Sequence, residues 1–389
     1  MGGTDRTGGM GGTDRTDGPD RIDRTDGPDG THRPLTVVHV VVTDGFAGVE
    51  RYICQVAGAL DGRGHRIHTI GGDPARMRSE LPDTVSNRPA GHLVQAALAL
   101  ATSRDADLVH LHMTAAEGAA WLSRPVQRAP FVATRHFAAD RGSSTAARIL
   151  ARVTSRVISQ DIAISRFVAG SITSPSVVIP NGVPDRPQAP LESPTVVMLQ
   201  RLDTEKSPDV GIRAFALSGL ARAGWRLVVA GQGTLRPSLL QLVDDLGMTG
   251  SVDLVGHVAA TDELLARSSI LLAPAPREPF GLSVVEAMAH GVPVVAADGG
   301  AHPETVGDDG MLVPPGDPEV MGGALRILGE DAGLRHAMGD ALRRRQQSRF
   351  SLSRHVDRLE QLYREVVAGK LGQTGAVDPE ESVSPEQIV

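Results

Sequence analysis

The chain of 389 residues is roughly two to three times the length of about 150 residues that is common for one domain, and its 41% hydrophobic and 22% charged residues are typical of globular proteins. A net charge of −7 and only 3% aromatic residues argue against binding of nucleic acid through a basic surface or by base stacking. The single cysteine, Cys54, excludes an intramolecular disulfide and a cysteine metal cluster.

Residues 1–33 are polar and repetitive, with GGTDRT at 2–7 and again at 11–16, and they offer almost no apolar surface for a core. Such a segment cannot offset the entropy of ordering, so we expect a disordered leader there and a disordered tail at 370–389. The leader has no apolar stretch of the signal-peptide kind, and no apolar run approaches the ~20 residues needed to span a bilayer. We therefore expect a cytoplasmic protein whose contact with membranes is at most peripheral.

The segment from 34 to 185 alternates between strand and helix patterns. LTVVHVVV at 35–42 is a continuous β-branched run and predicts a strand buried on both faces. A helix is predicted at 49–60, where apolar residues recur on one face. Alternation of this kind predicts βαβ units and a parallel sheet. The further short apolar runs of this half lie at 66–70, 107–113, 130–135, 161–165 and 176–180.

A Pro-rich, apolar-poor segment at 182–194 interrupts this pattern and predicts a linker. The alternation then restarts within 186–351, and an amphipathic helix at 352–369 is expected to cross back onto the first domain. We therefore predict an α/β fold of two Rossmann-like, doubly wound parallel-sheet domains that face each other across a cleft, where ligands bind. The strands of the second domain are predicted at 195–200, 226–231, 252–256, 269–274, 293–297 and 311–315.

The segment 276–304 carries the densest set of candidate catalytic and ligand-binding residues. Glu278 is expected in a loop at 276–281 and Glu286 a little over one turn into a helix at 282–290, so both carboxylates could face one cavity. The amides of Gly281, Leu282 and Ser283 would form the helix N-terminus, which favours anions. A site that binds a phosphate at the helix N-terminus and sugar hydroxyls at two carboxylates would suit a nucleotide sugar. The alternative is an ordinary turn with two surface glutamates.

Other candidates follow predicted strands, where a parallel sheet exposes its binding edge. Arg201 and Lys206 could neutralise a leaving diphosphate, or they could be solvated charges. Gly45 and Gly48 open the first helix and permit close approach of a ligand to the backbone, or they form a plain turn. His110 and His112 are expected to be satisfied core or edge histidines. Ser165 and Arg166 end another strand and are candidates for contact with the acceptor or a phosphate. Glu117, Asp140 and Arg141 are expected in loops on the same side and are candidates for contact with the acceptor.

The run E-P-F-G-L-x-x-x-E, the following A-M-A-x-G-x-P-V-V-A and the GG-x-x-x-E resemble the signature of retaining GT-B glycosyltransferases of family 4 (glycosyl transferases group 1). The resemblance extends over about residues 35–369, and its motifs occur in the family's order. They are FAGVER at 46–51, DLVHLH at 107–112, VATRHF at 132–137, IAISR at 162–166, VIPNGV at 178–183, QRLDTEKSPD at 200–209, VVAGQG at 228–233 and LVGHV at 254–258.

The resemblance implies roles for individual residues. Glu278 would bind hydroxyls of the donor sugar and Glu286 the ribose, while His136 would lie near the reacting sugar carbon. Sugar transfer would retain the anomeric configuration through front-face attack, with the leaving diphosphate helping to deprotonate the acceptor and no metal required. The remaining nucleotide-binding positions would be Gly48, Arg201, Lys206, Phe280, Gly281 and Leu282.

The implied function is transfer of a sugar from a nucleotide-diphosphate sugar to a hydroxyl acceptor, in the synthesis of a small soluble metabolite or an antibiotic of aminocyclitol type. Alternatives are a cell-envelope or glycolipid glycosyltransferase, a sugar-nucleotide epimerase and a non-catalytic nucleotide-sugar binder. Asp105-Ala-Asp107 matches a metal-binding DxD motif, but a helix-to-strand connection explains it better. An arginine stripe, Arg148, Arg152 and Arg156, is predicted on a helix at about 144–158, where a solvated face is a simpler explanation than a lipid-binding one.

Overall fold

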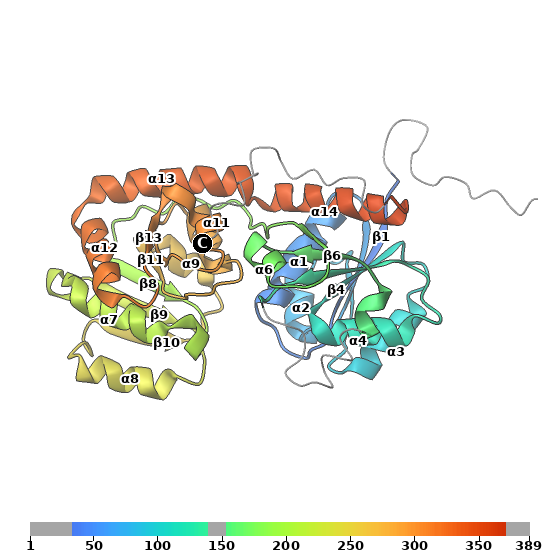
Figure 1. Ribbon diagram of the computed structural model, residues 1–389, viewed down its shortest axis with the longest axis horizontal. Coiled ribbons are helices and arrows are strands. Elements are labelled where there is room, and N and C mark those ends of the chain that lie inside the picture. The colour runs from blue at the N-terminus through green and yellow to red at the C-terminus, as the bar shows by residue number, and fades with distance from the viewer. Residues whose placement is uncertain (1–32, 139–152, 371–389) are drawn as a thin grey trace, which may run out of the picture. The chain divides into compact units, whose positions relative to one another are not determined.

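The computed structural model describes residues 33–138 and 153–370, and in them the chain builds two parallel sheets with helices on both faces (Figure 1). This is the fold class predicted from the sequence. The expected leader and tail, as well as Asp140, Arg141, Arg148 and Arg152, lie outside the described residues.

The first sheet has seven parallel strands in the order β3-β2-β1-β4-β5-β6-β7. The sequence predicted six of them, and β3 was missed because it is three polar residues long. Its strands are β1 (Thr36–Val41), β2 (Arg66–Ile70), β3 (Ser86–Arg88), β4 (Leu108–His112), β5 (Phe131–Arg135), β6 (Ile158–Ala163) and β7 (Ser176–Val178).

Helices cover both faces of this sheet because successive β1 side chains point to opposite sides. Val37 and Val41 pack with α1 (Gly48–Asp61) and α14 (Leu352–Val367), and Val38 and Val40 pack with α3 (Leu93–Thr102) and α4 (Met113–Ser123). Helix α14 follows the second sheet in sequence but buries its apolar stripe, including Tyr363, in the core of the first. The short helices of this half are α2 (Pro74–Glu80), η1 (Ser155–Val157) and α6 (Arg166–Gly170).

Only the end of the helix predicted at about 144–158 falls within the described residues. Its predicted end is wrong, since Arg156 lies in the 3-10 turn η1 and Ile158 begins β6. Residues 158–160 alternate in burial rather than forming a continuous apolar run, so the start of this strand could not be recognised from its apolar pattern.

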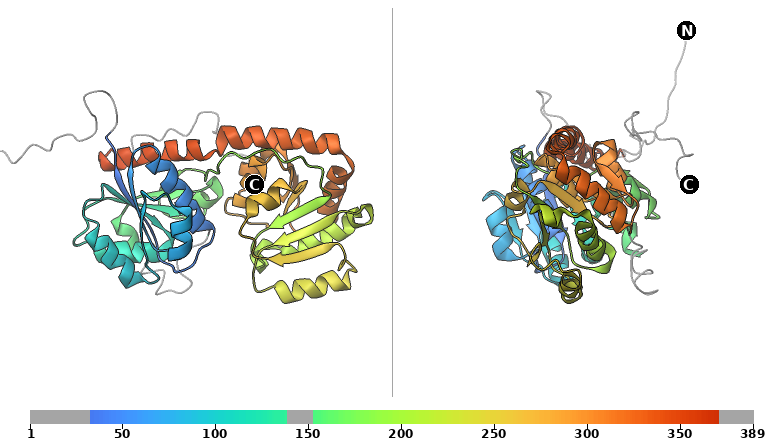
Figure 2. Two further views of the ribbon diagram at one scale, coloured as in Figure 1. Left: turned by 180° about the vertical axis from the view of Figure 1, so that it is seen from behind. Right: turned by 90° about the vertical axis from the view of Figure 1, so that its left-hand side faces the viewer.

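The second sheet has six parallel strands in the order β10-β9-β8-β11-β12-β13, and Figure 2 shows several of them from behind. All six were predicted. They are β8 (Thr195–Leu199), β9 (Arg226–Ala230), β10 (Val252–Gly256), β11 (Ile270–Ala273), β12 (Val294–Ala297) and β13 (Met311–Val313). The helical elements are η2 (Thr204–Lys206), α7 (Pro208–Ser218), η3 (Leu220–Ala223), α8 (Arg236–Asp245), α9 (Thr261–Ala266), α10 (Leu282–Ala289), α11 (His302–Val306), η4 (Gly307–Asp309), α12 (Pro318–Glu330) and α13 (Ala332–Arg349).

In both sheets the strand order reverses beside the first strand of the half, between β1 and β4 and between β8 and β11. Ligands of open α/β sheets bind outside the carboxyl ends of the strands at such a reversal. The segments after β4, β5, β8 and β11 are therefore where a site is expected. Within the described ranges, none of the helices has the length and apolar character required to cross a membrane.

Candidate functional site

Two segments that are far apart in sequence meet at the carboxyl edge of the second sheet. Lys206 lies at the end of η2, after β8, and Glu278 lies in the loop between β11 and α10. The Lys206 ammonium donates to the Glu278 carboxylate at 2.6 Å, and both side chains are 16% exposed. The other oxygen of Glu278 accepts from the Gly281 amide at 3.3 Å. Glu278 is therefore a partly buried, engaged group rather than a surface glutamate.

Two glycines hold this loop in place from the end of β12. Gly300 has φ +60°, and a Cβ atom there would lie 2.4 Å from the Glu278 nitrogen. A Cβ atom on Gly299 would lie 2.3 Å from the Pro276 oxygen. The Ala301 amide donates to the Glu278 carbonyl at 2.8 Å. The GG-x-x-x-E motif thus permits a close backbone approach that positions Glu278.

Arg201 has different partners from Lys206. Its guanidinium pairs with Asp203 and Glu205 of its own loop, and its side chain is 57% exposed. The structure therefore places Lys206, but not Arg201, beside Glu278.

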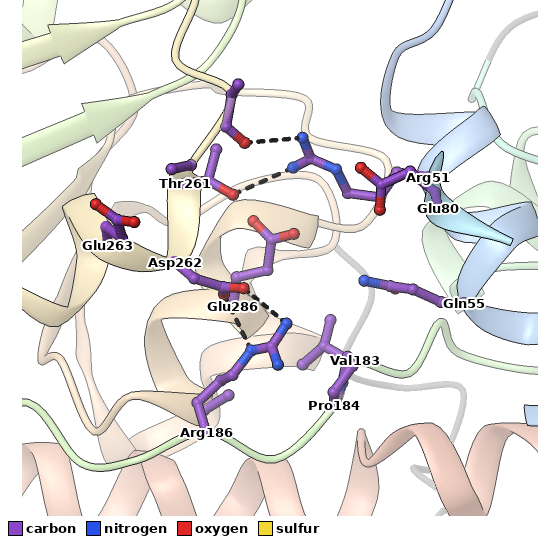
Figure 3. A pocket seen from close by; sticks show the side chains of 13 residues that line it. Arg51, Gln55, Glu80, Val183, Pro184, Arg186, Thr261, Asp262, Glu263 and Glu286 are labelled. Carbon is purple, nitrogen blue, oxygen red and sulfur yellow. Dashed lines mark hydrogen bonds and ion pairs between the residues drawn. The ribbon is translucent and has the colours of Figure 1, made fainter. Parts of the chain in front are cut away.

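Glu286 lines a cavity of about 310 Å³ (Figure 3). Arg51 and Gln55 of α1 point into it from one side, and Glu286 of α10 lies on the opposite side. The Arg51 guanidinium donates to the Thr261 hydroxyl at 3.1 Å. The other lining residues are Glu80, Val183, Pro184, Arg186, Ala259, Ala260, Asp262, Glu263 and Ala289.

Two of the carboxyl groups that line this cavity, Glu286 and Asp262, have pKa values shifted in opposite directions. Burial raises the pKa of Glu286 from 4.5 to about 7, which makes it partly protonated at neutral pH. A hydrogen bond from His290 and the nearby Arg186 guanidinium lower the pKa of Asp262. Arg186 donates to both Asp262 oxygens, at 3.0 and 2.7 Å.

Glu278 and Glu286 were expected to face one cavity. Glu286 lines the cavity described here, but Glu278 is not among its lining residues. Glu278 is turned toward Lys206 instead. The sequence spacing placed both residues near the start of α10. It could not show that Lys206 would bind the Glu278 carboxylate.

The predicted nucleotide-binding positions at the start of α10 differ in what they expose. The Phe280 ring is buried against Phe350, with ring centroids 5.9 Å apart, so its side chain is part of the core and only its backbone can face a ligand. Gly281 has φ +85° and precedes the helix, whose first residue is Leu282. Gly48 is the first residue of α1, and nothing lies within 4 Å of where its Cβ would be.

His136 follows β5 at the carboxyl edge of the first sheet. Its Nε2 lies 3.2 Å from Nδ1 of His112, and its ring contacts Tyr52 edge-on at 5.4 Å. Burial lowers its pKa to about 3, so the imidazole is neutral at pH 7. His110 and His112 are buried, as expected, and His110 bonds to the hydroxyls of Tyr363 and Thr134, each at 2.6 Å.

Glu117 was expected in a loop near an acceptor, and this expectation is wrong. Glu117 lies in α4, is 1% exposed, and pairs with Arg135, which also pairs with Asp161. The buried ion group of Arg135, Glu117 and Asp161 was not predicted from the sequence. The sequence feature that could have indicated this group is Arg135 at the end of the apolar strand β5, because a buried arginine needs a carboxylate partner.

Ser165 and Arg166 also contact protein groups. The Ser165 hydroxyl donates to the Pro279 carbonyl at 2.7 Å. The Glu304 carboxylate accepts from the amides of Arg166 and Phe167, each at 2.7 Å. Glu304, the last residue of the GG-x-x-x-E motif, therefore occupies the N-terminus of α6.

Two groups could be considered for a metal. In the described ranges, His39, His110 and His112 each offer a ring nitrogen within 4.8 Å of the others. In the DxD sequence, Asp107 accepts from the Thr36 amide at 2.8 Å and joins the connection before β4 to β1.

Comparison with known proteins agrees with this organisation. Residues 46–186 match the family model "Glycosyltransferase Family 4", and residues 184–345 match "Glycosyl transferases group 1". A D-inositol 3-phosphate glycosyltransferase of Kineococcus radiotolerans is 28% identical over 371 residues, which cover 81% of this chain and 84% of that protein. An exopolysaccharide phosphotransferase of Streptomyces coelicolor is 37% identical over 49% of this chain, but the match spans only 21% of that protein.

Among solved structures, Anabaena Alr3699/HepE in complex with UDP and glucose superimposes with a TM-score of 0.73 at 19% identity, covering 84% of this chain and 99% of that one. The chain therefore carries both glycosyltransferase domains and has the GT-B fold. It is an enzyme of the glycosyltransferase class.

Proposed function

We propose that this glycosyltransferase moves a sugar from a nucleotide-diphosphate sugar to a hydroxyl group of a small soluble acceptor, with retention of the anomeric configuration. The observation that carries the proposal is the Lys206–Glu278 pair at the carboxyl edge of the second sheet. It lies beside the N-terminus of α10, with Glu286 just over one turn further along the helix. A cation, a helix N-terminus and two carboxylates supply complementary partners for a diphosphate and for sugar hydroxyls.

In this proposal Lys206 and Arg201 bind the diphosphate and stabilise the charge that develops on it as the glycosidic bond breaks. Gly48 and the backbone of Phe280, Gly281 and Leu282 contribute close approach and amide donors. No metal is required, because these groups provide the positive charge.

Glu278 accepts hydrogen bonds from hydroxyls of the donor sugar, and Glu286 accepts them from the ribose. His136 contacts the sugar near the reacting carbon. The acceptor hydroxyl attacks from the side of the leaving diphosphate, which takes up its proton. Catalysis consists of positioning and charge stabilisation.

The acceptor class is inferred from a relative rather than from the geometry of the site. The printed name of the Kineococcus relative specifies a phosphorylated inositol, which is a small cyclitol, and this favours a soluble acceptor of that class, including the aminocyclitols of antibiotics. A cell-envelope or glycolipid acceptor is the alternative. Parallel assays with inositol phosphate and with phosphatidylinositol vesicles as acceptors separate the two.

A thermal-shift panel of UDP, dTDP, GDP and ADP, each with and without EDTA, tests the donor site. A nucleotide at 100 times its Kd stabilises the folded protein by about 2.7 kcal/mol. We expect a clear shift with one nucleotide that EDTA does not change. Lys206→Ala and Arg201→Ala should reduce the shift, while Lys370→Ala, at the only other lysine of the chain, should not.

No shift with any nucleotide, or equal shifts in all variants, would refute the diphosphate site. A shift that EDTA abolishes would refute the metal-free mechanism. Release of nucleotide diphosphate that is faster with acceptor distinguishes a transferase from an epimerase or a non-catalytic binder.

A further inference from the structure

Three histidine rings form a row that runs from the core of the first sheet to its carboxyl edge. His39 lies in β1, His112 ends β4 and His136 follows β5. Nδ1 of His39 is 3.1 Å from Nε2 of His112, and Nδ1 of His112 is 3.2 Å from Nε2 of His136. The first two rings are 0% exposed, and His136 is half-buried.

The strand register produces this row. Across β1 and β4, His39 pairs with His110 and Val41 pairs with His112. His39 and His112 of the row therefore share one face of the sheet, and His110 lies on the same face. The planes of His39 and His112 are within 11° of each other, which suits an in-plane hydrogen bond. Tyr52 of α1 contacts both His112 and His136 edge-on and helps to fix their orientation.

All three rings are neutral at pH 7, because burial lowers the pKa of His39 and His136 to about 3 and that of His112 well below 6.5. A neutral imidazole carries one N–H and one bare nitrogen. Two bonds in series therefore leave only two proton arrangements. In one arrangement all three rings carry the proton on Nδ1, so that His39 donates to His112 and His112 donates to His136. In the other all three carry it on Nε2, so that His136 donates to His112 and His112 donates to His39.

The inner end of the row decides between these arrangements. Nε2 of His39 is buried and has no hydrogen-bond partner among the described residues. If the protons lie on Nδ1, this atom is a bare acceptor. If they lie on Nε2, it is a buried N–H without a partner, which is rarer in proteins than an unsatisfied acceptor.

His302 provides an internal precedent. Its Nδ1 lies 2.9 Å from the Ala297 carbonyl, which can only accept, so the proton must be on Nδ1. Its Nε2 is then bare, and it is also buried without a partner among the described residues. The protein therefore tolerates a buried bare Nε2 in a histidine of fixed tautomer.

We propose that the row holds its protons on Nδ1 at His39, His112 and His136, so that His136 presents an N–H donor at its outer nitrogen. His39 and His112 act as positioning residues that fix this tautomer. That the group bound by His136 is a hydroxyl of the donor sugar rests on the proposed function. In this tautomer His136 donates to an oxygen of the sugar and does not take up the acceptor proton.

The tautomers can be measured on the full-length protein without substrate. Long-range nitrogen–proton NMR spectra of protein with 15N-labelled histidine distinguish N–H from bare nitrogen in each ring, and single His→Asn variants assign the three sets of signals. We expect Nδ1–H in all three rings, although free histidine favours Nε2–H. Nε2–H at His136 overturns the proposal. Stoichiometric metal on His39, His110 and His112, detected by elemental analysis, also overturns it, because a metal would use the lone pairs of the row.

A matched pair of nearly isosteric variants tests the role of His112. The amide nitrogen of His112→Asn can take the place of Nδ1 and donate to His136, whereas His112→Leu cannot. We expect Asn to keep Nδ1–H on His136, and Leu to shift His136 toward Nε2–H and lower kcat about tenfold, the value of one hydrogen bond, with unchanged nucleotide Kd. If the Leu variant keeps the wild-type tautomer, or the Asn variant behaves like Leu, the proposal fails.

These results are separable from the donor-site test. Nδ1–H at His136 in a protein that binds no nucleotide refutes only the proposed function. Nucleotide binding by a protein with Nε2–H at His136 refutes only this inference. The wild-type spectrum decides the tautomer even where a variant does not fold.

Discussion

Replacement of Glu286 by glutamine should change how the stability of the protein depends on pH. The pKa of Glu286 is raised from 4.5 to about 7 by burial beside the cavity. Between these values the unfolded chain loses the proton while the folded protein keeps it. The folded state therefore binds more protons, and wild-type stability falls as pH rises from about 4.5 through 7. Glutamine keeps the size of the side chain and removes the ionisation.

The size of the effect follows from the shift. One pKa unit corresponds to about 1.4 kcal/mol, so the full shift is worth ~3 kcal/mol as an upper bound for this half-buried group. A change of up to this size moves the melting temperature of a domain of 150–250 residues by at most roughly 6–12 °C. Glu286→Gln should therefore match wild type near pH 5 and melt several degrees higher near pH 8.

Thermal unfolding of both proteins at pH 5, 6, 7 and 8 measures the difference in melting temperature directly. Glu263→Gln is the matched control, since Glu263 lines the same cavity with a side chain that is 72% exposed. A difference between Glu286→Gln and wild type that stays constant from pH 5 to 8 would refute the assignment of a raised pKa to Glu286.

The remaining predictions concern the loops and the buried ion group. Glu278→Gln should lower the transfer rate at least about 100-fold and leave most nucleotide affinity, as measured by kinetics and calorimetry on the same preparation. Lys206→Ala should weaken nucleotide-diphosphate binding roughly 10- to 100-fold, and an unchanged Kd would contradict its role. Gly300→Ala should abolish transfer with an intact circular dichroism spectrum, because its Cβ displaces the Glu278 loop; wild-type activity would show that the loop can shift freely. Arg135→Leu should cost about 3–5 kcal/mol of unfolding free energy at pH 7 because it removes the guanidinium that the buried Glu117 and Asp161 carboxylates share. Burial raises the pKa of those carboxyls, so the loss should shrink toward pH 5 in urea titrations, and an equal loss at both pH values would contradict this explanation.

The sheets were largely predictable because a parallel strand covered on both faces must be a short continuous apolar run. Such runs marked β1 in the first sheet and β8, β9, β11 and β12 in the second. The same rule explains why β3 was missed, since Ser86–Arg88 is polar and lies at the edge of its sheet. The local hydrophobic pattern indicates whether a strand is buried. It does not indicate whether a polar segment pairs with the edge of a sheet.

The site was predictable as a set of segments, but the pairing of side chains was not. Motif order placed Arg201, Lys206, Glu278 and Glu286 after the strands that form the binding edge. The sequence could not show that Glu278 would bind Lys206, or that Arg201 would bind its own neighbours, Asp203 and Glu205. These choices depend on loop geometry of a few ångströms, which Gly300 and the loop after β8 determine.

The histidine row illustrates a different limit. Each of its residues could be read from the sequence as a polar group in or after an apolar strand, and His110 and His112 were correctly expected to be core residues. Their connection to His136 arises from the register between β1, β4 and β5, in which Val41 pairs with His112 and His112 with Thr134. Register is a property of the folded sheet and cannot be read from any one strand.

The pairing of Lys206 with Glu278 links the two halves of the proposed donor site. If Lys206 binds the diphosphate, its ammonium must share or leave its 2.6 Å contact with Glu278. That exchange makes the oxygens of Glu278 available for sugar hydroxyls at the moment when the sugar arrives. Arg201 lies in a largely exposed ion pair, which is worth about 1 kcal/mol or less, so it can change partners at little cost. A free nucleotide diphosphate without its sugar would draw Lys206 away and leave Glu278 without a hydroxyl partner. The intact nucleotide sugar should therefore bind more tightly than the nucleotide diphosphate in wild type, and this preference should disappear in Glu278→Gln.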